Sequence, residues 1–69
     1  MTKHKLTYKD DYVIRVEDIS GPKVKFVYLS KDKDNKWVRN KYYISTMDDS
    51  EIYAAIIYAN KENICLNLL

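Results

Sequence analysis

Residues 52–59 read Ile-Tyr-Ala-Ala-Ile-Ile-Tyr-Ala and carry no charge, in a 69-residue chain in which 32% of residues are charged. One set of apolar residues has the i, i+3, i+4, i+7 spacing that forms one face of a helix. This set is Ile52, Ala55, Ile56 and Ala59. The remaining surface of the same helix carries Tyr53, Ile57 and Tyr58. A helix that is apolar on nearly all sides needs a second surface to cover it, and we therefore expect these three residues to form a protein interface.

A second copy of the chain is the expected partner at this interface. At 69 residues the chain is near the lower size limit for a domain that folds alone, and such small chains often gain stability from oligomerisation. We therefore predict a homo-oligomer, most simply a dimer. The alternative is that the sheet and the C-terminal segment 64–69 cover the same side chains within one chain.

The residues before this helix give a strong start signal. Residues 45–51 read Ser-Thr-Met-Asp-Asp-Ser-Glu, and Thr46 or Asp48 can cap the helix. Asp48 with Glu51 three residues later approximates a capping box, and acidic residues in the first turn suit the positive end of the helix dipole. The helix is predicted to run to about residue 60 or 61, where an asparagine can terminate it.

Three segments rich in β-branched and aromatic residues precede the helix, at residues 12–19, 23–29 and 36–44. Short polar connections between them make them antiparallel neighbours. The predicted fold is therefore α+β, a single domain in which a three-stranded antiparallel meander packs on one C-terminal helix (β-β-β-α). Residues 1–9 are expected to be a flexible N-terminal segment, although residues 5–8 could add a short edge strand, and residues 64–69 could form a short final strand.

Period-two alternation assigns the strand residues to two faces of the sheet. The residues predicted to face the helix are Tyr12, Ile14, Val16, Val24, Phe26, Tyr28, Val38, Tyr42 and Ile44. The residues predicted on the opposite face are Val13, Arg15, Glu17, Lys25, Val27, Leu29, Trp37, Arg39, Lys41 and Tyr43. We expect Phe26 and Ile56 to be among the most buried residues, and Lys25 and Lys41 to be among the most exposed.

The opposite face mixes basic, aromatic and apolar side chains, whereas the solvent face of an antiparallel sheet is normally polar. Leu29 and Trp37 on this face would suit a protein partner. The residues that could instead contact nucleic acid, with basic groups on phosphates and an aromatic ring on bases or sugars, are Arg15, Lys25, Arg39, Lys41 and Tyr43. Three strands followed by one helix resembles the element order of integrase arm-binding domains and plant AP2 domains, which read DNA with the sheet. A third interpretation is a solvated face whose lysines keep the protein soluble.

Few groups in the sequence could build a catalytic, cofactor or metal site. One cysteine, Cys65, and one histidine, His4, cannot form an internal disulfide or a structural zinc site. Residues 32–36 begin like a calcium loop, but Trp37 stands where that loop needs glycine, so a polar hairpin turn is expected. A chain with one glycine has no glycine-rich phosphate loop. We therefore predict a protein that is not an enzyme and has no cofactor and no metal.

Charge is distributed unevenly along the chain. Residues 1–47 contain 11 Lys or Arg and 6 Asp or Glu, a net charge of +5, whereas residues 48–69 contain 1 and 4, a net charge of −3. The basic N-terminal part could bind anionic partners, or it could complement the acidic C-terminal part of another copy within a homo-oligomer. The lone thiol and the lack of a signal peptide or of a stretch approaching about 20 apolar residues predict a cytoplasmic protein with no membrane contact.

The predicted function is a small protein-interaction or regulatory module that self-associates and inhibits or regulates a host protein. Its richness in Lys, Asn, Ile and Tyr is typical of an AT-rich genome and favours a phage or mobile-element origin. The alternative is a nucleic-acid-binding regulator that uses the basic and aromatic face of the sheet. A structural subunit of a larger assembly is a third class.

Overall fold

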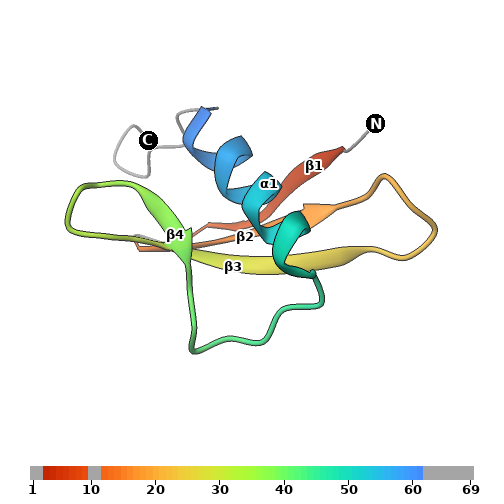
Figure 1. Cartoon of the computed structure of the whole chain (residues 1–69), viewed down its shortest axis with the longest axis horizontal. Coiled ribbons are helices and arrows are strands. Elements are labelled where there is room, and N and C mark those ends of the chain that lie inside the picture. The colour runs from red at the N-terminus through yellow and green to blue at the C-terminus, as the bar shows by residue number, and fades with distance from the viewer. Residues whose placement is uncertain (1–2, 10–11, 62–69) are drawn as a thin grey trace.

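The computed structural model, described here for residues 3–9 and 12–61, contains four strands followed by one helix (Figure 1). The elements are β1 (His4–Lys9), β2 (Val13–Asp18), β3 (Lys25–Lys31), β4 (Trp37–Arg39) and α1 (Asp49–Lys61). The strands form one antiparallel sheet in the order β1-β2-β3-β4, and α1 lies across one face of it. The predicted α+β class is confirmed, with a fourth strand in addition to the three expected. Within the described residues, no helix is long and apolar enough to cross a membrane.

The additional strand is β1, which includes the short edge strand considered for residues 5–8. It pairs with β2 from His4 opposite Asp18 to Lys9 opposite Ile14, with an irregularity in register between Leu6 and Tyr8. The final strand considered for residues 64–69 lies outside the described residues.

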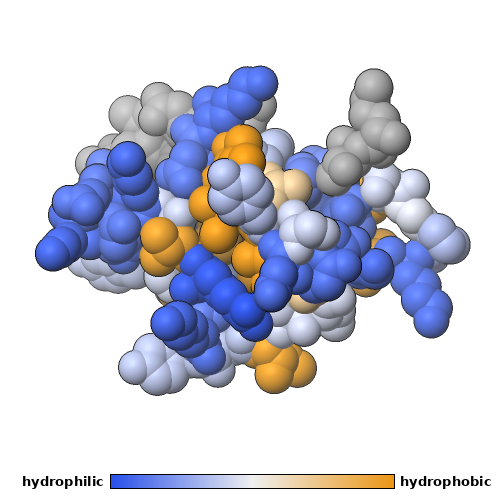
Figure 2. Space-filling view, viewed as in Figure 1, coloured by the Kyte–Doolittle hydropathy of each residue, from blue (hydrophilic) through white to orange (hydrophobic). Residues whose placement is uncertain are grey.

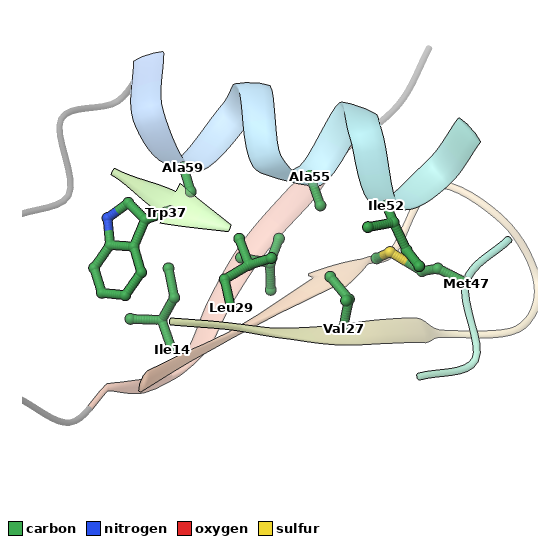
Figure 3. Packing of buried hydrophobic residues seen from close by; sticks show 9 residues of the cluster. Ile14, Val27, Leu29, Trp37, Met47, Ile52, Ala55 and Ala59 are labelled. Carbon is green, nitrogen blue, oxygen red and sulfur yellow. The ribbon is translucent and has the colours of Figure 1, made fainter. Parts of the chain in front are cut away.

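The hydrophobic core lies between the sheet and α1 (Figure 3). Its members are Ile14, Val16, Val27, Leu29, Trp37, Met47, Ile52, Ala55 and Ala59. Ala55 and Ala59 are completely buried, and their small side chains let the helix approach the sheet closely. Trp37 lies beneath the Ala59 end of α1, while Met47 lies beside Ile52 at the other end. The alanine face of α1 thus packs closely on the sheet, and Trp37 at one end and Met47 at the other complete the core.

The register between β2 and β3 corrects the predicted faces of β3. Ile14 pairs with Leu29 and Val16 with Val27, so all four side chains point toward α1. The prediction that Phe26 and Tyr28 lie beneath the helix was therefore wrong by one residue. Because β3 is apolar on both faces, its own alternation does not choose between them, and a slip of one residue reverses every side chain.

The same error affects β4 and the residues after it. Trp37, predicted on the open face, is 2% exposed in the core, whereas Tyr42 and Ile44, predicted beneath the helix, are 95% and 80% exposed. Three more residues that were predicted to face the helix are exposed instead: Tyr12, Val24 and Val38. Phe26 and Ile56, expected among the most buried residues, are only partly buried. Of the two lysines expected to be highly exposed, Lys41 is exposed but Lys25 is partly buried.

Asn40 ends β4 much earlier than the predicted strand at residues 36–44. Its backbone N–H donates to Tyr28 O at 2.9 Å, its Nδ2 donates to Ser30 Oγ at 2.6 Å, and its Oδ1 accepts from the Tyr42 N–H at 2.7 Å. This side-chain-to-backbone contact turns the chain out of the sheet. The chain returns to the edge of β3 at Thr46, whose N–H and Oγ1 contact Phe26 O and N at 3.1 and 2.8 Å. Residues 41–45 are consequently a loop held at both ends against β3.

The predicted capping box at the start of α1 is confirmed. The Glu51 N–H donates to Asp48 Oδ1 at 2.9 Å, and the Asp48 N–H donates to Glu51 Oε1 at 3.0 Å. These reciprocal bonds satisfy two backbone donors that the helix itself cannot pair. Chiefly because it accepts the Glu51 N–H, the Asp48 carboxylate has a pKa below its ordinary value. The described part of α1 reaches Lys61, and the residues that follow lie outside the described part of the chain.

Candidate interaction surfaces

Side chains from three segments gather on the sheet face that α1 does not cover. We call this group the open-face cluster and define it as Arg15, Phe26, Tyr28, Tyr43 and Ile44. The Phe26 and Tyr28 rings meet edge to face with centroids 5.9 Å apart, and the Tyr43 ring lies 4.8 Å from Tyr28. The rings and Ile44 line a shallow groove of about 460 Å³. Ile44 is 80% exposed, so the cluster presents an aliphatic side chain to solvent beside three aromatic rings.

Arg15 is held in place within the open-face cluster by contacts to three strands. Its Nε donates to Thr7 Oγ1 of β1 at 2.8 Å, and its Nη1 donates to Tyr28 Oη of β3 at 3.3 Å. The guanidinium carbon lies 5.8 Å from the centroids of both Phe26 and Tyr28, in the range of cation–π attraction. Nη2 pairs with Glu17 at 3.3 Å, so part of the charge is balanced within the protein. These contacts make Arg15 a pre-positioned planar group rather than a free cation.

The loop at residues 41–45 completes the open-face cluster. Its ends are bonded to β3 through Asn40 and Thr46, and Ser45 Oγ also donates to Phe26 O at 2.8 Å. Because both ends are tied to the same strand, Tyr43 is brought onto Tyr28 although the two residues belong to different elements. Phe26, Tyr28 and Ile44 were predicted to face the helix and lie instead on the open face. A usable signal was that tyrosine, with a polar hydroxyl, suits a partly exposed site better than valine or leucine does.

The five residues predicted to contact nucleic acid do not share one surface. Only Arg15 and Tyr43 belong to the open-face cluster, where each contacts Tyr28. Lys25 instead pairs with Glu51 of α1 at 3.0 Å, and the hydrogen bond to that carboxylate raises the pKa of Lys25 above its ordinary value. Arg39 and Lys41 lie together on a separate shallow surface, with Ser30, Asn40 and the highly exposed Tyr42. The correct register thus divides the predicted site into three places.

The residues predicted as a protein interface are also divided. Leu29 and Trp37 are buried in the core at 0% and 2% exposure, so the prediction that they lie on the open face was wrong. Tyr53 and Ile57 project from the outer side of α1 and are 67% and 47% exposed. Tyr58 is partly buried and stacks on His4 of β1, with ring centroids 5.0 Å apart. Hydrophobic residues accordingly gather along α1 on the face shown in Figure 2.

The polar side chains of the calcium-like stretch at residues 32–36 stabilise a turn. Asp32, the first residue of the calcium-like stretch, accepts the N–H groups of Asp34 and Lys36 at 2.9 and 3.0 Å and so stabilises a hairpin turn. Asn35 takes a left-handed conformation there, with φ of 64°. Residues 3–9 and 12–61 contain no group of three or more His, Cys, Asp or Glu side chains that could hold a metal ion.

No known protein family, curated protein or solved structure matches this chain. The chain presents three candidate binding surfaces: the open-face cluster, the surface that carries Arg39, Lys41 and Tyr42, and the outer side of α1.

Proposed function

We propose that this protein is a non-enzymatic interaction module that binds a host protein through the open-face cluster and thereby regulates or inhibits it. The observation that supports this proposal is the exposure of Ile44, at 80%, beside aromatic rings and a pre-positioned arginine. Protein interfaces concentrate their binding energy in tyrosine, tryptophan and arginine side chains packed around desolvated apolar contacts. Occupying a partner's surface is the simplest means by which such a binding surface can regulate that partner.

A protein partner fits the open-face cluster better than a phosphate backbone does. The charge of Arg15 is already shared with Glu17 at 3.3 Å and with the Tyr28 hydroxyl at 3.3 Å, which leaves less of it for an anion. An exposed aliphatic residue such as Ile44 contributes nothing to phosphate contact, but its burial under a protein side chain would stabilise a complex. The rigid setting of Arg15 and of the loop at residues 41–45 lowers the entropy cost of binding.

The proposal can be tested by capture from a lysate of the source cell, with and without nuclease, followed by affinity measurement on the captured protein. Ile44→Asp places a charge in the groove and should weaken binding at least about tenfold, as loss of an interface hot spot does. Tyr42→Asp is the matched control, since it adds the same charge two residues away at a side chain that does not line this groove. A complex that nuclease removes, or one that Ile44→Asp leaves intact, would contradict the proposal.

Nucleic-acid binding is the second candidate, and one observation favours it. Arg39 and Lys41 lie on the same surface as Tyr42, a residue that is 95% exposed and could stack on a base. If this surface binds DNA, the double variant Arg39→Ala/Lys41→Ala should flatten the log–log salt dependence of affinity by about 2. If the protein acts through protein contact instead, its DNA affinity at physiological salt should be no tighter than about 10⁻⁴ M.

A further inference from the structure

The outer side of α1 carries an apolar pair with no partner among the described residues. Tyr53 and Ile57 are four positions apart, are 67% and 47% exposed, and lie on the side of the helix opposite Ala55 and Ala59, which are fully buried against the sheet. Figure 2 shows hydrophobic residues along α1 with hydrophilic residues on both sides of them. The pair therefore forms a separate surface from the open-face cluster, on the other side of the molecule.

The sequence of α1 is symmetric about residue 55 in both its outward apolar and its terminal charged positions. Tyr53 and Ile57 each lie two positions from residue 55, and Asp49 and Lys61 each lie six positions from it. If two copies of α1 packed antiparallel with residue 55 of one beside residue 55 of the other, Tyr53 would lie against Ile57 of the second copy. The same alignment would place Asp49 near Lys61 of the second copy, twice, because a two-fold interface repeats each contact.

The charges at the helix ends are available for this pairing. At the start of α1, the Glu51 carboxylate already pairs with Lys25 at 3.0 Å, and the Asp48 carboxylate accepts the helix cap. Asp49 and Lys61 form no ion pair with any residue that the structure describes. A parallel arrangement would instead bring Asp49 to Asp49 and Lys61 to Lys61, and it would align the two helix dipoles unfavourably.

We infer that the outer side of α1 binds the same surface of a second copy of this chain, antiparallel and across a two-fold axis. The contact is weak. A 13-residue helix is about 20 Å long, so the interface falls below the roughly 1,200 Å² that stable complexes bury. The expected dissociation constant is about 10–100 μM, in the range of transient interfaces. The inference does not rest on the proposed function, because it uses neither the residues nor the face of the open-face cluster.

Sedimentation equilibrium from low micromolar to about 1 mM tests the dimer itself. Tyr53→Glu or Ile57→Glu should raise the dissociation constant at least about tenfold while circular dichroism shows the native helix content. Ile44→Asp, on the other side of the sheet, is the matched control and should leave dimerisation unchanged, which also separates this test from that of the proposed function. A protein that is monomeric at about 1 mM, or a dimer that persists in Tyr53→Glu, overturns the inference.

A charge exchange tests the antiparallel geometry. Asp49→Lys and Lys61→Asp each place like charges at both ends of the interface, and each variant alone should dimerise about five- to tenfold more weakly at low ionic strength. An equimolar mixture of the two variants restores opposite charges at both ends only in the mixed dimer. We expect that mixed dimer to regain wild-type affinity within about threefold, and the gain to shrink at high salt. A mixture that associates no better than the two variants separately overturns the antiparallel arrangement, whatever each substitution does to helix stability.

Discussion

Replacing Leu29 by alanine tests the register on which the open-face cluster depends. Leu29 is completely buried beside its β2 neighbour Ile14, on the sheet face that meets α1, so its truncation removes core contacts and leaves a cavity. Such substitutions cost about 2–5 kcal/mol of unfolding free energy. Domains have about 0.05–0.15 kcal/mol of stability per residue, roughly 3–10 kcal/mol for a 69-residue chain, so Leu29→Ala removes a large part of the total.

The matched variant is Phe26→Ala, three positions earlier on the opposite face of β3. Phe26 is only partly buried and contacts the edge of Tyr28 and the guanidinium of Arg15, and these contacts together are worth about 1–2 kcal/mol. Had Phe26 faced the helix, as its strand pattern predicted, the same substitution would cost about 3–5 kcal/mol.

Urea unfolding followed by fluorescence measures the difference, because the single tryptophan, Trp37, is buried in the core. With a slope near 1 kcal/mol per molar urea, expected for a chain this small, a difference of about 2 kcal/mol separates the two midpoints by about 2 M. An equal or larger loss of stability for Phe26→Ala than for Leu29→Ala would refute the register and, with it, the open-face cluster.

Three further predictions concern α1 and its contact with the sheet. Asn60 Oδ1 accepts from the Trp37 backbone N–H at 2.9 Å, and Asn60 Nδ2 donates to Trp37 O at 3.1 Å. Asn60→Ala should therefore lower the free energy of unfolding by about 1–2 kcal/mol, measured by urea unfolding. Lys61→Ala, the control, should lower it little. Asp48 has a pKa lowered on folding, so its stabilising contribution is present above its unfolded pKa of about 3.9 and is lost as pH falls through the folded value. The melting temperature of the wild type should therefore fall more between about pH 5 and pH 2 than that of Asp48→Asn. Ile56→Glu places a charge beside the core and should unfold the monomer, whereas Ile57→Glu, on the outer side, should leave the circular dichroism spectrum native.

Local sequence patterns predicted the features of this protein that depend on residues close together in the chain. The helix over residues 49–61 follows from the apolar spacing, and its first turn follows from Asp48 and Glu51, which are three residues apart. The outward position of Tyr53 and Ile57 follows from the same periodicity, since α1 has one face, formed by Ala55 and Ala59, that can approach a sheet. The α+β class likewise follows from strands joined by short turns and followed by one helix.

Only the tertiary structure decided which face of β3 and β4 meets the helix. Val27 and Leu29 compete with Phe26 and Tyr28 for the core, and both pairs are apolar, so the alternation within β3 is equally consistent with either face. The choice is made by pairing with β2, eleven or more residues away in sequence, where one face carries Ile14 and Val16 and the other carries the charged Arg15 and Glu17. The open-face cluster exists because of that choice and because Asn40 and Thr46 tie the intervening loop to β3. Contacts between distant segments are not encoded in any local pattern, and this is why the helix was predictable and the sheet surface was not.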